Sequence, residues 1–244
     1  MVLLEVSDLH KAFGGIHAVN GAAFSVAEGS VTSLIGPNGA GKTTAFNMIN
    51  GVLASDRGSA RFDGVELIGK RPHQITRLGI SRTFQVTRTL PALTVVENMA
   101  LAAPTGGVRA LLGSRVLERE REQALELLEF VGIARLADSK AADLSYGQRK
   151  LLEFAAVMMS NPRLVLLDEP AGGVNPALLE EITSRIDTLR HEGITFLIVE
   201  HNMELVMQLS DSVIVMAQGQ VIIQDQPSVV QADPRVLDAY LGVA

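Results

Sequence analysis

The chain has 244 residues, of which 47% are hydrophobic, and its formal net charge is −6. Cysteine is missing from the sequence, which excludes disulfides and thiolate metal sites, and the acidic, mixed-sign charge argues against a nucleic-acid partner. No apolar run approaches the 18 or so residues that cross a bilayer and the first residues lack a secretory signal, so we expect a cytosolic location.

The first 70 residues alternate short β-rich runs with turn signals. We predict strands over 3–9, 22–29, 30–36 and 59–67, with a turn at Asp63-Gly64 inside the last run. The pattern becomes helical from residue 41 to residue 50. This part of the chain therefore predicts a small sheet and a core strand that ends at Ile35, followed by a glycine loop and a helix that begins near Lys42.

The glycine loop matches the pattern G-x-x-x-x-G-K-[ST] of phosphate-binding loops. Glycines let backbone N–H groups converge on phosphate oxygens at a helix N-terminus, whereas an ordinary glycine-rich turn would not require the flanking strand and helix. Lys42 would reach the β- and γ-phosphates and the Thr43 hydroxyl would bind Mg²⁺. The residues that we expect to contact the nucleotide here are Gly36, Pro37, Asn38, Gly39, Ala40, Gly41, Lys42, Thr43 and Thr44.

Residues 86–160 differ in character from the rest. Pro91, Pro104 and a Gly106-Gly107 pair interrupt their first half, and a heptad-like helix is predicted from about Val116 to Val131. We interpret this segment as a helical insertion.

After the insertion, two apolar β-rich runs at 164–169 and 195–201 flank a helix predicted from Pro176 to His191. Buried parallel strands joined by crossover helices have this pattern. The remaining residues predict a hairpin that turns at Gln218-Gly219, and then a short C-terminal helix through Tyr240.

Two carboxylates and a histidine follow the two apolar strands. Asp168 and Glu169 end the first strand, at the sheet edge where ligands bind in open α/β sheets, and His201 follows the second strand at the same edge. Asp168 would hold Mg²⁺ and Glu169 would polarise the attacking water. A strand end with a solvated turn is the alternative for the carboxylates, and a structural or exposed histidine is the alternative for His201.

The segment LSYGQ, which includes Ser145, Tyr146, Gly147 and Gln148, resembles the LSGGQ signature of ABC transporter ATP-binding subunits. On its own it could be a helix start with Ser145 as the N-cap. The motifs nevertheless run in the order of that family: phosphate loop, Gln85, LSYGQ, LVLLDEP, the loop 171–176 and His201. The resemblance covers essentially the full chain.

The resemblance implies an α/β fold, with a P-loop NTPase (RecA-like) core, an N-terminal antiparallel β subdomain and an inserted helical subdomain. Residues 1–244 would form a single nucleotide-binding domain. Within it, 1–85 and 161–244 would form the ATP-binding core and 86–160 the helical signature subdomain.

The resemblance also implies roles for single residues. Gln85 would sense Mg²⁺ and the attacking water, so that Thr43, Gln85 and Asp168 form the metal set, while Glu169, His201 and Gln85 form the catalytic set. The signature would complete the ATP site of the opposite subunit in a head-to-tail dimer with a second ATP-binding subunit, which is either the same chain or a relative. Phe13 would stack on adenine, with a packed core phenylalanine as the alternative.

Asn175, where many ABC ATPases have aspartate, resembles the subgroup that serves branched-chain amino-acid importers, as do SRTFQVTRTLPALTVVENM, VEHNMELVM and DAYLG. The resemblance implies an ATP hydrolase that uses ATP and Mg²⁺. It would bind transmembrane permease subunits as a peripheral protein on the cytoplasmic face of the inner membrane. The ATPases of lipopolysaccharide export and of urea or amide import have closely similar sequences and remain alternatives.

Other phosphate-loop proteins fit the sequence less well. A metabolite kinase would need an acceptor-binding lid in place of LSYGQ and His201, and a GTPase would need an N-K-x-D tetrapeptide, which does not occur. An ABC module for DNA repair or translation control usually has long coiled coils or two fused copies, and this sequence has neither.

Overall fold

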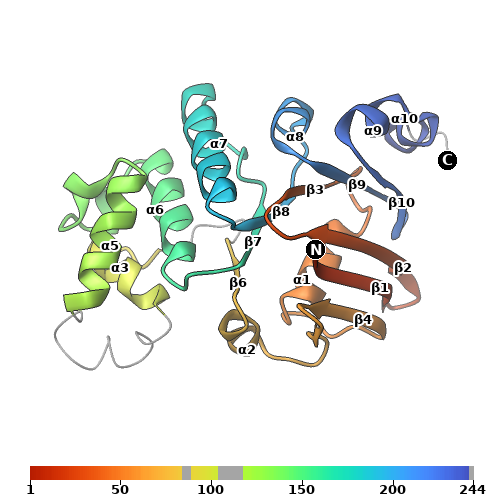
Figure 1. Ribbon diagram of the computed structural model, residues 1–244, viewed down its shortest axis with the longest axis horizontal. Coiled ribbons are helices and arrows are strands. Elements are labelled where there is room, and N and C mark those ends of the chain that lie inside the picture. The colour runs from red at the N-terminus through yellow and green to blue at the C-terminus, as the bar shows by residue number, and fades with distance from the viewer. Residues whose placement is uncertain (84–88, 104–117, 242–244) are drawn as a thin grey trace.

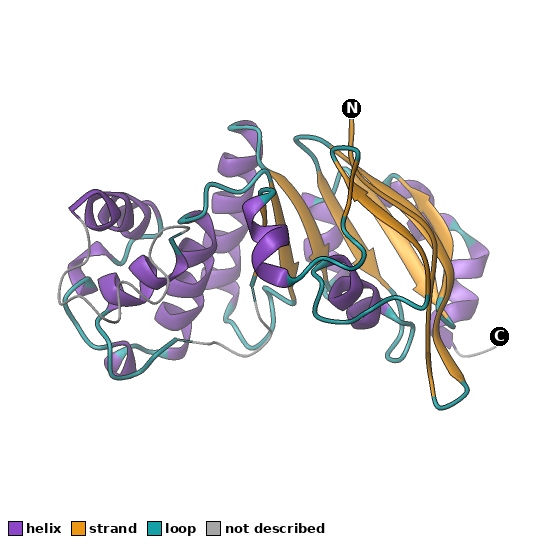
Figure 2. Ribbon diagram, turned by 90° about the horizontal axis from the view of Figure 1, so that it is seen from below, coloured by secondary structure: helices purple, strands orange, loops and turns teal. Residues whose placement is uncertain are grey.

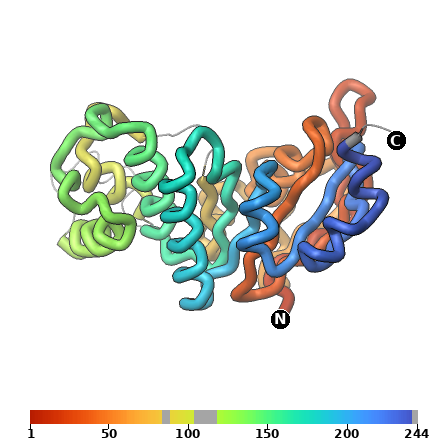
Figure 3. The backbone as a smooth tube through the Cα atoms, turned by 90° about the horizontal axis from the view of Figure 1, so that it is seen from above, coloured from red at the N-terminus to blue at the C-terminus, as the bar shows by residue number. Residues whose placement is uncertain are grey.

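The computed structural model describes residues 1–83, 89–103 and 118–241. Two β-sheets lie at one end of the elongated molecule and a group of helices lies at the other end, as Figures 1, 2 and 3 show from three directions. The α/β architecture expected from the sequence is confirmed.

The smaller sheet has four strands, is antiparallel, and lies within the first 66 residues. Its order is β2-β1-β4-β5, with β1 (Val2–Phe13), β2 (Ile16–Ala27), β4 (Arg57–Phe62) and β5 (Val65–Glu66). The strands predicted at 3–9, 22–29 and 59–67 all lie here, and the first two are longer than predicted. The turn predicted at Asp63-Gly64 is confirmed, since both residues have left-handed backbone angles, with φ of 49° and 75°.

The larger sheet has six strands in the order β10-β9-β3-β8-β7-β6. Its strands are β3 (Val31–Ile35), β6 (Ile80–Arg82), β7 (Leu164–Asp168), β8 (Thr195–Val199), β9 (Ser212–Ala217) and β10 (Gln220–Asp225). All neighbouring strands are parallel except β9 and β10, and every residue of β3, β7 and β8 is buried. The carboxyl ends of these three strands therefore meet at one edge of the sheet.

Alternate residues of the buried strands pack on opposite faces of the larger sheet, as the two-residue period of a strand requires. Leu164 and Leu166 belong to a core shared with the smaller sheet and with α1 (Lys42–Ile49). Val165 and Leu167 belong to a second core that is built mainly of helices. The phosphate-loop helix α1 is thus held between the two sheets.

The helical group contains α3 (Val95–Ala102), α5 (Glu118–Phe130) and α6 (Tyr146–Met158), with two short 3₁₀ turns between α5 and α6. In Figure 1 these helices lie on the left, away from the smaller sheet. The described part of the helix predicted over 116–131 is confirmed by α5. Ser145 caps α6 in a capping box with Gln148, which agrees with the helix start in that segment.

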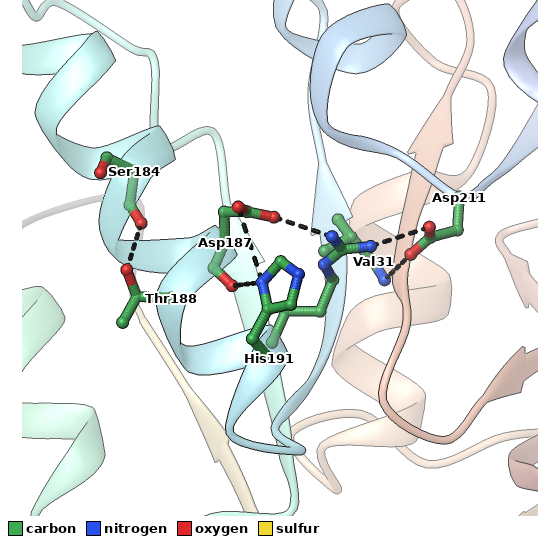
Figure 4. Close-up of polar contacts among 7 residues, drawn as sticks. Val31, Ser184, Asp187, Thr188, His191 and Asp211 are labelled. Carbon is green, nitrogen blue, oxygen red and sulfur yellow. Dashed lines mark hydrogen bonds and ion pairs between the residues drawn. The ribbon is translucent and has the colours of Figure 1, made fainter.

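The helix α7 (Pro176–His191) has the predicted bounds and covers the face of the larger sheet opposite α1. Its last turn is tied to β3 and β9 through Arg190, which donates to Asp187 and to Asp211. Asp211 also accepts from the backbone N–H of Val31, and Figure 4 shows these contacts together with the bond between His191 and Asp187. The C-terminal end of α7 is therefore fixed to the sheet by charged groups.

The C-terminal part differs slightly from the prediction. The hairpin at Gln218-Gly219 is confirmed, with φ of 49° and 80°. Two helices follow it instead of one, α9 (Pro227–Ala232) and α10 (Pro234–Leu241). Asp233 between them is extended, as expected of a residue that precedes a proline, and so the first helix ends there. Two other short helices, α2 (Pro72–Arg77) and α8 (Met203–Leu209), were not predicted.

None of the helices in the described ranges combines the length and the apolar character that spanning a membrane would require.

Candidate functional site

The phosphate loop connects β3 to α1, at the edge where the parallel strands end. Gly36 and Gly41 have φ angles of 145° and 101°, which L side chains rarely adopt. A Cβ at Gly36 would lie 2.0 Å from the carbonyl oxygen of Met216, and one at Gly41 would lie 2.3 Å from that of Ala18. Both positions therefore require glycine, because the backbone of neighbouring strands closes in on the loop.

The start of α1 offers unpaired backbone donors to an anion. Gly41 is its N-cap and provides no side-chain cap, so the N–H groups of the first turn, which includes Thr43 and Thr44, point out of the helix unblocked by a cap. Asn38 and Gly39 are exposed at the tip of the loop. This arrangement can bind phosphate oxygens.

The Lys42 side chain folds back over the loop. Its Nζ donates to the carbonyl oxygens of Gly36 at 2.6 Å and Pro37 at 3.0 Å. Burial lowers the pKa of Lys42, while the negative charges of Glu169 and Asp168 act in the opposite direction. The ammonium group is therefore held by two weak acceptors within reach of both carboxylates, and phosphate oxygens would be stronger partners for it.

Asp168, the last residue of β7, is buried in a polar network. Its Oδ2 accepts from Nη2 of Arg82 at 2.8 Å, and Nη1 of Arg82 donates to Oδ1 of Asn47 at 2.6 Å. The side chains of Arg82 and Asp168 are only 6% and 4% exposed. One arginine thus connects the end of β6, the carboxylate of β7 and the phosphate-loop helix.

Glu169 lies directly after Asp168, in a left-handed backbone conformation with φ of 50°. Its backbone N–H donates to the carbonyl oxygen of Val199 at 2.9 Å, so the ends of β7 and β8 stay paired. Its Oε1 lies 3.9 Å from Nδ1 of His201, whose side chain is 68% exposed. The structure therefore brings together the carboxylate and the histidine that the sequence places after two different strands, at a distance longer than a direct hydrogen bond.

The oxygen atoms at this edge suit Mg²⁺. This ion prefers oxygen ligands and in nucleotide sites is usually held by one or two carboxylates together with substrate phosphates. Asp168 lies near enough to Lys42 for their charges to interact, and Thr43, which follows Lys42 in the first turn of α1, is exposed, so both residues suit such a site. Gln85, the third expected ligand, lies outside the described residues.

The signature segment contacts the loop that follows Glu169. The Tyr146 hydroxyl donates to the carbonyl oxygen of Gly172 at 2.9 Å, and Lys150 lies over the Tyr146 ring at 5.8 Å. A Cβ at Gly147 would come within 2.8 Å of Leu178, so this glycine permits α6 to approach α7 closely. Ser145 bonds to Gln148 within its own capping box, and α6 lies in the helical group, apart from α1 (Figure 1).

Phe13 ends β1 and is 48% exposed, with Nζ of Lys11 5.7 Å from its ring centroid. The ring thus presents apolar surface to solvent, whereas the core-phenylalanine alternative would require it to be buried. An exposed ring face is what stacking on adenine needs.

Two residues of this site, Arg82 and Glu200, were not predicted from the sequence. Glu200 follows β8, is 1% exposed, and accepts from the backbone N–H groups of Ala171, His201 and Asn202. In the sequence, its only signal is an acidic residue that directly follows an apolar strand. The signal of Arg82 is a charged residue at the end of the short strand β6.

Comparisons with known proteins agree with this geometry. The family model described as "ABC transporter" matches residues 19–172. A probable branched-chain amino acid transport ATP-binding protein LivG from Archaeoglobus fulgidus is 41% identical over 99% of this chain and 96% of its own. The high-affinity branched-chain amino acid transport ATP-binding protein BraF of Pseudomonas aeruginosa is also 41% identical, over 99% of this chain and 98% of its own.

A solved structure gives the same result for the fold. The ADP conformation of an ATP-binding cassette of an ABC transporter is 36% identical, with a TM-score of 0.90 over 99% of both chains. This likeness confirms the P-loop NTPase core that the motif order implies. The chain therefore belongs to the family of ABC transporter ATP-binding proteins.

Proposed function

We propose that this chain hydrolyses ATP to drive the uptake of branched-chain amino acids through separate permease subunits. The observation that carries the proposal is the convergence of Lys42, Asp168, Glu169 and His201 on one edge of the larger sheet, beside the N-terminus of α1. The names of the two relatives, each 41% identical over nearly the whole chain, support the solute class.

The proposal assigns a role to each group of residues. Backbone N–H groups of the phosphate loop and Lys42 would bind the β- and γ-phosphates, and the Phe13 ring would stack on adenine. Mg²⁺, held by Thr43, Asp168 and Gln85, would neutralise charge on the phosphates. Ser145, Tyr146, Gly147 and Gln148 would face the γ-phosphate bound to the partner subunit of a head-to-tail dimer.

Hydrolysis would then be in-line. A water oxygen attacks the γ-phosphorus while the bond to the β–γ bridging oxygen breaks, which gives ADP and phosphate. The Glu169 carboxylate orients the water and accepts its proton, and His201, whose Nδ1 lies 3.9 Å from Oε1 of Glu169, helps to position the same water. Both residues act by position and charge, which is where catalysis of phosphoryl transfer mainly arises.

A groove between the helical group and the larger sheet supports docking of the permease. It has a volume of about 480 Å³ and lies between α2, α3 and α6, next to Arg82 and Thr89. In the proposal, residues 1–85 and 161–244 form the ATP-binding core and residues 86–160 the helical subdomain. Movement of the helical subdomain on ATP binding would be transmitted through this groove to permease subunits, which would hold the chain at the cytoplasmic face of the inner membrane.

Steady-state hydrolysis tests the proposal. The purified chain should release phosphate from Mg-ATP without an added acceptor, which a metabolite kinase would require. Lys42→Ala should lose most ATP affinity, and Glu169→Gln should bind ATP but hydrolyse it at least about 100-fold more slowly, since it removes a general base. Glu204→Gln, an exposed carboxylate on α8, is the matched control and should retain the wild-type rate.

Normal hydrolysis by Glu169→Gln would contradict the assignment of the base. The solute class is tested separately, by ATP-dependent uptake of labelled leucine into proteoliposomes that contain the chain and its co-purified permease. Uptake of urea instead, or no dependence on leucine, would contradict the amino-acid assignment.

A further inference from the structure

Glu200 is a fully buried carboxylate at the edge of the larger sheet that contains the hydrolysis residues. Its side chain has 0% exposure, and a buried carboxylate is costly unless hydrogen bonds compensate it. Its Oε1 accepts from the N–H of Ala171 at 2.7 Å, and its Oε2 accepts from the N–H groups of His201 at 2.9 Å and Asn202 at 3.1 Å. Each oxygen therefore binds a different loop.

The first of these loops carries Glu169. Ala171 lies two residues after it, and the N–H of Gly172 closes a turn onto the Glu169 carbonyl oxygen at 2.9 Å. On the other side, the Glu169 N–H is bonded to Val199, the residue before Glu200. The chain from Glu169 to Ala171 is thus bonded to the end of β8 both at its start and, through the Glu200 side chain, at its end.

This closed arrangement explains how Glu169 holds its backbone conformation. A non-glycine residue with φ of 50° is strained and persists only when its surroundings determine it closely. The bonds at Glu169 and Ala171 provide that constraint. The same carboxylate also binds the N–H of His201, so one side chain is bonded both to the loop that carries Glu169 and to the backbone of His201.

Capping of α8 does not account for these contacts. Asn202 is the N-cap of α8 and already accepts from the N–H of Leu205 at 3.1 Å. The bond from Glu200 to Ala171 reaches a different loop, 29 residues away in the sequence, and contributes nothing to that helix.

We propose that Glu200 is a positioning residue for hydrolysis, which holds the Glu169 loop and the His201 loop in fixed relation. This inference rests on the proposed ATPase function. It assigns no contact between Glu200 and the nucleotide, so the loss of its bonds should reduce turnover and leave ATP binding intact.

Glu200→Gln tests the proposal because it keeps the size of the side chain. An amide has a single acceptor oxygen, so its NH₂ group must face an N–H of one of the two loops. We expect kcat for ATP hydrolysis to fall about 10-fold, which corresponds to about 1.4 kcal/mol, while KM and ATP affinity stay within about twofold. Glu204→Gln, which changes an exposed carboxylate on α8, is the control and should match the wild type.

Amide hydrogen exchange gives a second readout that does not depend on hydrolysis. In Glu200→Gln the amides of Ala171, His201 and Asn202 should exchange about 10-fold faster than in the wild type, since they lose charge-assisted bonds. Glu200→Asp keeps the charge but is one methylene too short to reach both loops, so it should also lose kcat. A purely electrostatic role would leave that variant active.

Three results would overturn the positioning role of Glu200. They are unchanged exchange at Ala171 and His201, a wild-type kcat in Glu200→Gln, and a rise in KM as large as the fall in kcat. A wild-type chain that fails to hydrolyse ATP would instead contradict the proposed function, and the exchange measurement would still decide whether Glu200 ties the loops together.

Discussion

Arg82 and Asp168 form a buried ion pair beside the phosphate-loop helix. Taking two charges out of water is costly, and the pair is stable only because each group keeps its partner. Asn47 satisfies the second nitrogen of the guanidinium, and the Arg82 guanidinium carbon lies 5.3 Å from the centroid of the Phe46 ring. The arginine therefore holds the Asp168 carboxylate ready at the sheet edge.

Replacement of Arg82 by leucine should leave the buried Asp168 carboxylate without its charged partner. We expect Arg82→Leu to lower the free energy of unfolding by about 3–5 kcal/mol, measured by urea denaturation at neutral pH. Arg163→Leu is the matched control. Arg163 also binds two carboxylates, those of Asp63 and Glu28, but its side chain is 44% exposed, so its loss should cost about 1 kcal/mol or less. Equal losses for both variants would contradict the argument from burial.

Tyr146 occupies the variable position of the signature and binds the loop after Glu169 through its hydroxyl. Tyr146→Phe removes only that bond, worth about 1 kcal/mol, and retains the ring over Lys150. We expect hydrolysis to slow several-fold with unchanged ATP affinity, because the hydroxyl orders loops but does not contact the phosphate loop. Single-turnover hydrolysis and ATP titration would measure the two quantities, and wild-type hydrolysis by this variant would refute the role.

The residues of the site divide into two classes by how well the sequence predicts them. The phosphate loop, Asp168, Glu169 and His201 lie in short local motifs, and their element context alone predicts that they meet at one edge. Arg82 and Glu200 act through partners that are 86 and 29 residues away. No local pattern encodes those contacts, since they depend on which strand ends become neighbours in the sheet.

At the scale of elements, one acidic side chain adds to the backbone pairing that holds the short strand β5 against β4. Glu66 accepts from the Ser59 hydroxyl and from the N–H groups of Ala60 and Ile68. Burial alone would raise the pKa of Glu66, but these hydrogen bonds outweigh it and the pKa lies below its usual value. The ionised carboxylate therefore stabilises this corner of the smaller sheet.

The lowered pKa predicts how this contribution depends on pH. Since the folded-state pKa is below that of the unfolded chain, the stabilisation is complete above the unfolded value of about 4.5 and is lost as the pH falls through the folded value. Glu66→Gln should thus be less stable than the wild type at pH 7, and the difference should shrink towards pH 3. Urea unfolding at several pH values measures it, and a pH-independent difference would contradict the linkage.

Long or continuously apolar elements were predicted well and short ones were missed. The buried strands β3, β7 and β8 and the helices α1 and α7 follow from apolar runs and clear boundaries. The three residues of β6 and the seven of α8 are too short to show a period, and tertiary contacts decide their conformation. The order of strands in the larger sheet also depends on pairings between distant segments, which sequence periodicity does not specify.

At the scale of the whole molecule, the two halves of the proposed ATP site lie on different parts of one chain. The phosphate loop lies between the sheets, whereas Ser145 begins α6 in the helical group (Figure 1). In the proposed function, the signature would therefore complete the ATP site of a second subunit. ATP binding should join two chains and hydrolysis should separate them.

The most direct test is the light-scattering mass of Glu169→Gln with and without Mg-ATP, because blocked hydrolysis should trap the closed pair. The account predicts that saturating Mg-ATP doubles the mass. It also predicts that Glu169→Gln combined with Ser145→Arg binds ATP but remains a single chain, since arginine would block the signature. A Glu169→Gln chain that binds ATP and keeps the mass of one subunit would contradict the self-pairing, head-to-tail site.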